Sequence, residues 1–131
     1  MTDLVFPKPP KRNRKQETLS RKRELAAFRH QVLAADGHKC VAIKIGCKCK
    51  GRLVAHHIDF RSHCGGNDIK NGATLCELAA HYHVHNGIKI GGVLYSGREY
   101  MLMILRSHKD DKGFRWQAVM EILERRYGDG D

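Results

Sequence analysis

Apolar residues recur at helical spacing between Thr18 and Ala35, near the start of the chain. Four of them lie three or four positions apart, which predicts an amphipathic helix with a single apolar stripe: Leu25, Phe28, Val32 and Ala35. Asp36-Gly37 predicts the end of this helix, because glycine readily adopts the left-handed backbone conformation. We expect the stripe to pack into the core of a folded domain.

Residues 38–58 are predicted to form a β-hairpin. Gly46 and Gly51 punctuate this segment, and Val54 and Ile58 are residues that favour strands. The next segment, 59–72, is rich in glycine, asparagine and aspartate, which is typical of a loop.

A second helix is predicted shortly after this loop. The short extended piece Ala73-Thr74-Leu75 leads into it, and it runs from Cys76 to His85. Asn86-Gly87 ends it, because both residues favour a helix C-terminus.

The C-terminal third predicts a final helix and leaves the segment before it ambiguous. Ser96-Gly97-Arg98-Glu99 has the spacing of a capping box and favours a helix, but the unbroken apolar run 101–105 equally fits a buried strand. The last helix is indicated by apolar residues at helical spacing: Trp116, Met120, Leu123 and Tyr127. Three arginines give it a basic surface: Arg115, Arg125 and Arg126.

These elements predict a single α+β domain over residues 18–131, with residues 88–131 as a C-terminal extension. Residues 1–17 are predicted to be a disordered basic arm, because three prolines disfavour a helix and five lysines and arginines repel one another. The arm is either a solvated tail or a segment that follows a phosphate backbone.

The charge of the chain indicates an anionic partner. The 131 residues carry a net charge of +10, and 41% of them are hydrophobic. Such an excess of positive charge attracts nucleic acid through phosphate neutralisation, although it also suits anionic membranes or solubility. The basic residues beside the first apolar stripe are candidates for DNA contact: Arg21, Lys22, Arg23 and Arg29.

The pattern of apolar residues predicts a cytoplasmic protein. No apolar run approaches the roughly 20 residues that a membrane span needs, and the N-terminus lacks the hydrophobic segment of a secretory signal. Cysteines in such a compartment stay reduced, which favours metal binding over disulfides. The chain has five: Cys40, Cys47, Cys49, Cys64 and Cys76.

The histidines suggest a metal-assisted reaction. His81 and His85 are four residues apart on a predicted helix, so both imidazoles can reach one metal ion, whereas His83 faces away. His56 and His57 are neighbours on a predicted strand and point to opposite sides. One can therefore face the metal while the other faces substrate or solvent. A neutral histidine can activate water for phosphodiester hydrolysis, and a divalent cation can stabilise the charge that develops.

In this order, the residues resemble the HNH nuclease motif, also called the ββα-metal or His-Me finger. The resemblance covers about residues 37–87 and rests on these matches: His56-His57-Ile58, Gly65-Gly66, Asn71, Leu75-Cys76, His81 and Val84-His85-Asn86-Gly87. It implies a ββα-metal core, with flanking helices, in which a β-hairpin and a helix hold one metal ion. It also implies hydrolysis of DNA.

The resemblance further implies a role for each matching residue. His57 would be the general base, and Asn71 would brace the loop and orient His57. His56, His81 and His85 would bind one divalent cation, which could be Mg²⁺, Mn²⁺, Ni²⁺ or Zn²⁺. Three loop residues are candidates for phosphate contact, with loop hydrogen bonding as the alternative for the last two: Arg61, Ser62 and Asn67.

The cysteines depart from the zinc-binding shell of two Cys-x-x-Cys pairs that many HNH proteins have. Ile43 stands where Cys40 should find its partner, Cys47-Lys48-Cys49 comes late, and Ala79 replaces the fourth cysteine. Two alternatives follow. A structural zinc recruits Cys40, Cys47 or Cys49, Cys76 and Cys64, or the shell has decayed and packing alone holds the core.

We therefore expect a metal-dependent HNH endonuclease that nicks or cuts double-stranded DNA and has no membrane partner. The compact basic form is typical of phage or prophage proteins by analogy. One alternative is a non-catalytic, metal-stabilised module that binds nucleic acid. Another is an RNA-directed nuclease, although the sequence lacks a cluster of aromatic residues for stacking on single-stranded bases.

Overall fold

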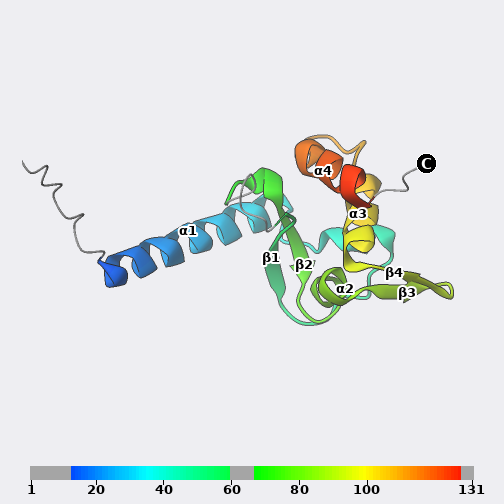
Figure 1. Ribbon diagram of the computed structural model, residues 1–131, viewed down its shortest axis with the longest axis horizontal. Helices are drawn as coiled ribbons and strands as arrows, with labels where there is room; N and C mark the ends of the chain where they lie inside the picture. The colour runs from blue at the N-terminus through cyan, green and yellow to red at the C-terminus, as the bar shows by residue number, and fades with distance from the viewer. Residues whose placement is uncertain (1–12, 60–66, 128–131) are drawn as a thin grey trace, which may run out of the picture.

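Four α-helices and two small antiparallel sheets form the part of the chain that the computed structural model describes, residues 13–59 and 67–127 (Figure 1). This architecture confirms the α+β class. Its elements follow in chain order: α1 (Arg14–Ala35), a 3₁₀ helix (Val41–Ile45), β1 (Leu53–His57), a second 3₁₀ helix (Ile69–Asn71), β2 (Gly72–Cys76), α2 (Ala80–Asn86), β3 (Ile88–Ile90), β4 (Val93–Tyr95), α3 (Gly97–Ser107) and α4 (Gln117–Tyr127). Within the described ranges, no helix has the length and apolar character needed to cross a membrane.

The first helix is longer than its apolar stripe predicts. α1 begins at Arg14, where the Asn13 side chain caps it by accepting a hydrogen bond from the Gln16 N–H. The prediction of disorder is therefore wrong for residues 14–17, and residues 1–12 lie outside the described part. Of the predicted stripe, only Phe28 and Val32 are buried. Leu25 is exposed because the N-terminal part of α1 extends beyond the rest of the domain (Figure 1), and Ala35, at the end of the helix, is exposed as well.

The prediction of a hairpin confined to residues 38–58 is wrong. β1 pairs instead with β2, with His57 opposite Gly72 and Leu53 opposite Cys76. The segment before β1 cannot pair with it, because residues 41–45 form a 3₁₀ helix that ends at Gly46 in the left-handed conformation, with φ of 89°. Every residue of β2 is buried.

The predicted second helix begins later than expected. Strand pairing extends β2 to Cys76, and backbone hydrogen bonds from Glu77 to Arg52 and from Leu78 to Lys50 continue it, so α2 begins at Ala80. The predicted loop 59–72 contains the second 3₁₀ helix, where Asp68 accepts a hydrogen bond from the Lys70 N–H.

The C-terminal third resolves the ambiguous segment. Ser96 and Glu99 form a reciprocal capping box, and residues 101–105 are helical within α3. The preceding hairpin of β3 and β4 was not predicted from the sequence. It turns at Gly91-Gly92, and both glycines have positive φ, as tight hairpin turns require.

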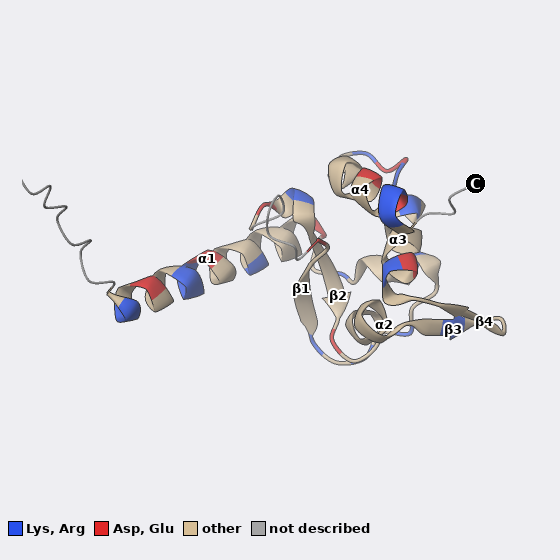
Figure 2. Ribbon diagram, in the orientation of Figure 1, with Lys and Arg blue, Asp and Glu red and all other residues tan. Residues whose placement is uncertain are grey.

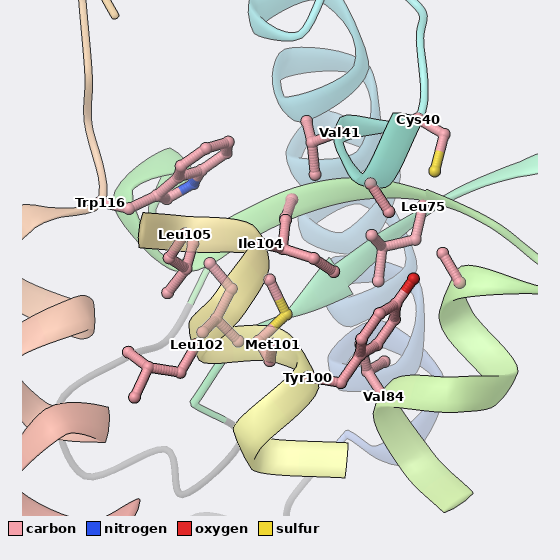
Figure 3. Close-up of a cluster of buried hydrophobic side chains, with 14 of the residues drawn as sticks. Cys40, Val41, Leu75, Val84, Tyr100, Met101, Leu102, Ile104, Leu105 and Trp116 are labelled. Atoms are coloured by element: carbon pink, nitrogen blue, oxygen red, sulfur yellow. The ribbon is translucent and has the colours of Figure 1, made fainter. Parts of the chain in front are cut away.

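The apolar core surrounds α3. Figure 3 shows Ile104 of this helix close to Leu75 of β2 and Val41, with Leu105 on the side of Trp116. The last helix, α4, contributes a buried face at the predicted Met120 and Leu123, together with Val119. Trp116, which lies just before α4, donates from its indole N–H to the Gly72 carbonyl at 2.8 Å.

A part-buried ion pair fixes the start of β2 between α1 and α4. The Arg115 guanidinium donates to Asp36 at 2.7 Å and to the Gly72 carbonyl at 2.9 Å. A Cβ at Gly72 would lie 2.3 Å from Val32, so no larger residue fits where α1 crosses β2. These contacts position the end of β1, where the candidate site lies.

Candidate functional site

Three histidines meet between β1 and α2. His56 is only 4% exposed, His81 is half-buried and His85 is exposed. Their ligand nitrogens all lie within 4.8 Å of one another, and the Nε2 atoms of His81 and His85 are 3.1 Å apart. Two imidazoles on one zinc ion, each at about 2.0–2.1 Å, have their nitrogens about 3.3 Å apart. The three residues could therefore hold one metal ion with little movement.

Local periodicity explains this convergence. The four-residue spacing places His81 and His85 on one face of α2. Alternation along β1 directs His56 towards that face, where its ring meets both of theirs edge-on, with centroids 5.3 Å and 5.2 Å away.

The protonation state of this group suits metal binding. Burial, and then the proximity of His81 and His85, lowers the pKa of His56 from 6.5 to about 3. Burial and the charge of His85 also lower the pKa of His81. A neutral imidazole offers a nitrogen lone pair, which is the form that a metal ion requires.

His57 lies on the other face of β1, against α1. Its ring stacks on the Phe28 ring, with centroids 4.2 Å apart and planes 12° from parallel. Its Nε2 atom is 3.0 Å from the Asn67 Oδ1 atom. An amide oxygen only accepts hydrogen bonds, so this contact places the proton on Nε2 and leaves Nδ1 as the basic nitrogen.

Asn71 braces the backbone just after β1. It is 4% exposed, and its side chain accepts from the Asp59 N–H at 2.8 Å and donates to the Asp59 carbonyl at 2.9 Å. Its own carbonyl accepts from the Ile58 N–H at 2.8 Å. These bonds fit the bracing role expected of Asn71, whereas the amide that contacts the His57 ring belongs to Asn67.

The sequence suggested Asn67 only as a phosphate contact or a loop hydrogen-bonding residue. No sequence pattern pairs it with His57, because the two are joined through the intervening loop rather than by a regular element. His83, which the spacing directs away from His81 and His85, is half-buried and donates from Nδ1 to the Gly87 carbonyl at 3.2 Å. Arg61, Ser62, Cys64, Gly65 and Gly66 lie outside the described residues.

Four cysteines form a second group at the opposite end of β1 and β2. Cys40, Cys47, Cys49 and Cys76 have all their sulfurs within 4.8 Å of one another. Cys47 Sγ lies 3.7 Å from Cys76 Sγ and 4.0 Å from Cys49 Sγ. Four thiolates at about 2.3 Å from a tetrahedral zinc ion are about 3.8 Å apart, so this group could hold a metal ion such as Zn²⁺.

Without a metal ion, the surroundings of the cysteine group keep three of its four thiols neutral. Burial raises the pKa of Cys40 to about 12, and burial together with the neighbouring thiols raises the pKa of Cys47 and of Cys49 to about 11. Burial would also raise that of Cys76, but hydrogen bonds from the Ala80 and Lys50 N–H groups outweigh it and lower the pKa to about 7. Deprotonating several adjacent thiols requires the positive charge of a metal ion.

Comparisons of the chain with protein-family models, with curated proteins and with solved structures gave no match. The geometry of the two groups therefore carries the functional argument.

Proposed function

We propose that this protein is a metal-dependent HNH endonuclease that hydrolyses phosphodiester bonds of DNA. One observation carries the proposal. His56, His81 and His85 converge on one side of β1, while the adjacent His57 is held on the other side with a defined basic nitrogen. The order of a strand, a second strand and a helix around these residues supports a ββα-metal core.

His57 serves as the general base. Its Nδ1 atom accepts a proton from the water that attacks the phosphorus, while the bond from Nε2 to Asn67 and the stack on Phe28 fix the plane of the ring. Asn71 keeps the end of β1 in place through the Asp59 backbone. Because these contacts exist before substrate binds, the ring needs little reorganisation during the reaction.

Three histidine ligands suit a catalytic ion. A site with three protein ligands leaves coordination positions open, as catalytic metal sites do. A divalent cation held there, such as Mg²⁺, Mn²⁺, Ni²⁺ or Zn²⁺, supplies charge stabilisation to the phosphoryl oxygens and the leaving 3′ oxygen.

The cysteine group serves a structural role in the same proposal. Four sulfur ligands complete a tetrahedral zinc site and leave no position for substrate. Cys40 and Cys47 flank the first 3₁₀ helix, and Cys76 ends β2, so a zinc ion here would tie that helix to the sheet.

The test is incubation of supercoiled plasmid with purified protein in Mg²⁺, Mn²⁺, Ni²⁺ or EDTA. We expect metal-dependent nicking or linearisation that EDTA abolishes. His57→Ala should reduce the rate by about 10²- to 10⁴-fold, the usual contribution of a general base. His30→Ala is the matched control, since His30 is an exposed histidine of α1. Plasmid that is retarded on the gel but intact with every metal would instead support a non-catalytic binding module.

A further inference from the structure

The N-terminal part of α1 has no packing partner among the described residues. Every residue of α1 from Arg14 to Ala27 is exposed, and Phe28 is the first buried one. Figure 1 shows this part of the helix projecting away from both sheets. Isolated helices of about 12–15 residues are marginally stable in water, so this segment gains stability from any partner that binds it.

The charges on this helix are arranged in rows. Positions seven residues apart on an α-helix differ by only about 20° in direction. Arg14 and Arg21 are therefore in line with Phe28, and Lys15 and Lys22 are in line with Arg29. Figure 2 shows Lys and Arg as blue bands along α1. The two acidic residues of α1, Glu17 and Glu24, form a separate row beside these.

The first basic row leads to His57 of the candidate site, and the second leads to the opposite end of β1. Phe28, at the end of the first row, stacks on His57. Arg29, at the end of the second, donates from its guanidinium to the Leu53 carbonyl at the start of β1, at 3.4 Å. We define the basic face of α1 as the five cations of these rows: Arg14, Lys15, Arg21, Lys22 and Arg29.

The dimensions and composition of this face fit duplex DNA. Fourteen residues separate Arg14 from Phe28, a distance of about 21 Å along a helix, and six base pairs of B-DNA span about the same length. The exposed leucines of α1, Leu19 and Leu25, are six positions apart and point about 120° from each other, so they form no apolar stripe. A membrane surface or a second copy of the helix would require such a stripe.

We propose that the basic face of α1 binds the phosphates of duplex DNA beside the bond to be cleaved. This inference rests on the proposed nuclease function for the identity of the polyanion. The contacts are to the backbone, so binding through α1 is independent of base sequence and weakens as salt increases.

The test compares two variants that each remove four positive charges. One is Arg14→Gln, Lys15→Gln, Arg21→Gln and Lys22→Gln, which changes only exposed residues of α1. The matched control is Lys89→Gln, Lys109→Gln, Lys112→Gln and Arg125→Gln, which are exposed on β3, after α3 and on α4. Fluorescence anisotropy gives the Kd for a 30-base-pair duplex from 50 to 300 mM salt, without added divalent cation, and a denaturing gel checks that the duplex stays intact.

We expect the α1 variant to bind at least about tenfold more weakly than the control at 100 mM salt. The logarithm of the association constant decreases linearly with the logarithm of the salt concentration. The steepness of this decrease should be smaller by about 0.9 for each phosphate that the variant no longer neutralises. Equal Kd values and equal slopes for the two variants would overturn the inference. The inference would also be overturned if the α1 variant lost self-association but kept its DNA affinity, or if it lost affinity only for single-stranded RNA.

Hydrogen exchange on the unmodified protein provides a second test that needs no variant. Duplex DNA should slow amide exchange across residues 14–27, and unchanged exchange there at saturating DNA would contradict the inference. Neither measurement depends on cleavage. Weakened binding by the α1 variant, in a protein that never cuts plasmid, would therefore sustain DNA binding by α1 while refuting the proposed nuclease function.

Discussion

The cysteine group and the histidine group lie at opposite ends of the same strand pair. They differ in the number of coordination positions that they would leave open on a bound metal ion. Cys76 pairs with Leu53 at one end, and His56 pairs with Ala73 three positions along β1, about 10 Å away. The cysteine group has four sulfurs, and the histidine group has three nitrogens beside an exposed helix face. Ligand number and type therefore separate a closed site suited to holding the fold from an open one suited to reacting with substrate.

The same strand pair also shows how one residue position separates two roles. His56 and His57 are adjacent, yet His56 is buried beside the other two histidines of the candidate metal site, and His57 stacks on Phe28 of α1. Alternation along β1 makes this separation possible. Four predictions test these two comparisons, from the largest expected effect to the smallest.

Loss of a cysteine ligand should have the largest effect. Cys76→Ser should remove the bound zinc and leave the protein largely unfolded, since structural zinc sites contribute of the order of 10 kcal/mol to folding. Elemental analysis and circular dichroism measure both effects. Cys64→Ser is the control and should retain one structural zinc, because four other cysteines already form the group. Wild-type protein that contains no zinc and folds normally would contradict the structural role.

Loss of a helical histidine should affect the other site alone. His81→Ala should weaken Ni²⁺ or Mn²⁺ binding at the histidine group by at least about a hundredfold, because only two ligands remain, and should leave the cysteine-bound zinc unchanged. Calorimetric titration measures the affinity. His83→Ala is the control, since its ring bonds to the Gly87 carbonyl instead of joining the group. An unchanged affinity in His81→Ala would remove it from the ligand set.

Acid should destabilise the protein through His56 when no divalent cation is added. Folded protein keeps this ring neutral down to a pKa of about 3, whereas the unfolded chain protonates it near 6.5, so stability falls as pH decreases through that window. Between pH 6.5 and 4.5, His56 should lower the free energy of unfolding by about 2–3 kcal/mol. Urea unfolding of wild type and His56→Gln at both pH values measures it. Equal losses in the two proteins would show that His56 does not titrate in this way.

The two asparagines near His57 should separate positioning from bracing. Asn67→Ala should lower the cleavage rate by about tenfold with little change in stability, because it removes the exposed side chain that fixes the tautomer of the His57 ring. Nitrogen NMR of the imidazole should show the Nε2–H tautomer in wild type and a mixture in the variant.

Asn71→Ala provides the contrast. It should cost about 1–3 kcal/mol of unfolding free energy, since it leaves the buried N–H and carbonyl of Asp59 without their side-chain partner. Equal effects of the two substitutions on both stability and rate would mean that Asn67 has no separate positioning role.

Patterns within single elements were the most predictable part of the fold. The capping box at Ser96 and Glu99, the last helix around Met120 and Leu123, and the end of α1 at Asp36-Gly37 all appear as expected. Each depends on residues close together in sequence. The missed start of α1 is also local, but an asparagine cap at Asn13 stands in a stretch where prolines and repelling charges suggested disorder.

Contacts between elements were not predictable in the same way. The strand that pairs with β1 lies beyond the loop. The fourth sulfur of the cysteine group comes from Cys49, which is two residues after Cys47 in an irregular segment. Irregular backbone has no periodicity from which the direction of a side chain can be inferred. The spacing therefore left a zinc site and a decayed shell as equal alternatives.

By itself, the sequence determined the relations that one helix or one strand imposes: His81 and His85 on a shared face, and His56 and His57 on opposite faces. Only the tertiary structure decided that His56 faces α2, that His57 meets Phe28 and Asn67, and that Cys40 reaches Cys76. The physical reason is that the backbone geometry of a regular element fixes its own periodicity, whereas the meeting of distant segments depends on the packing of the whole core.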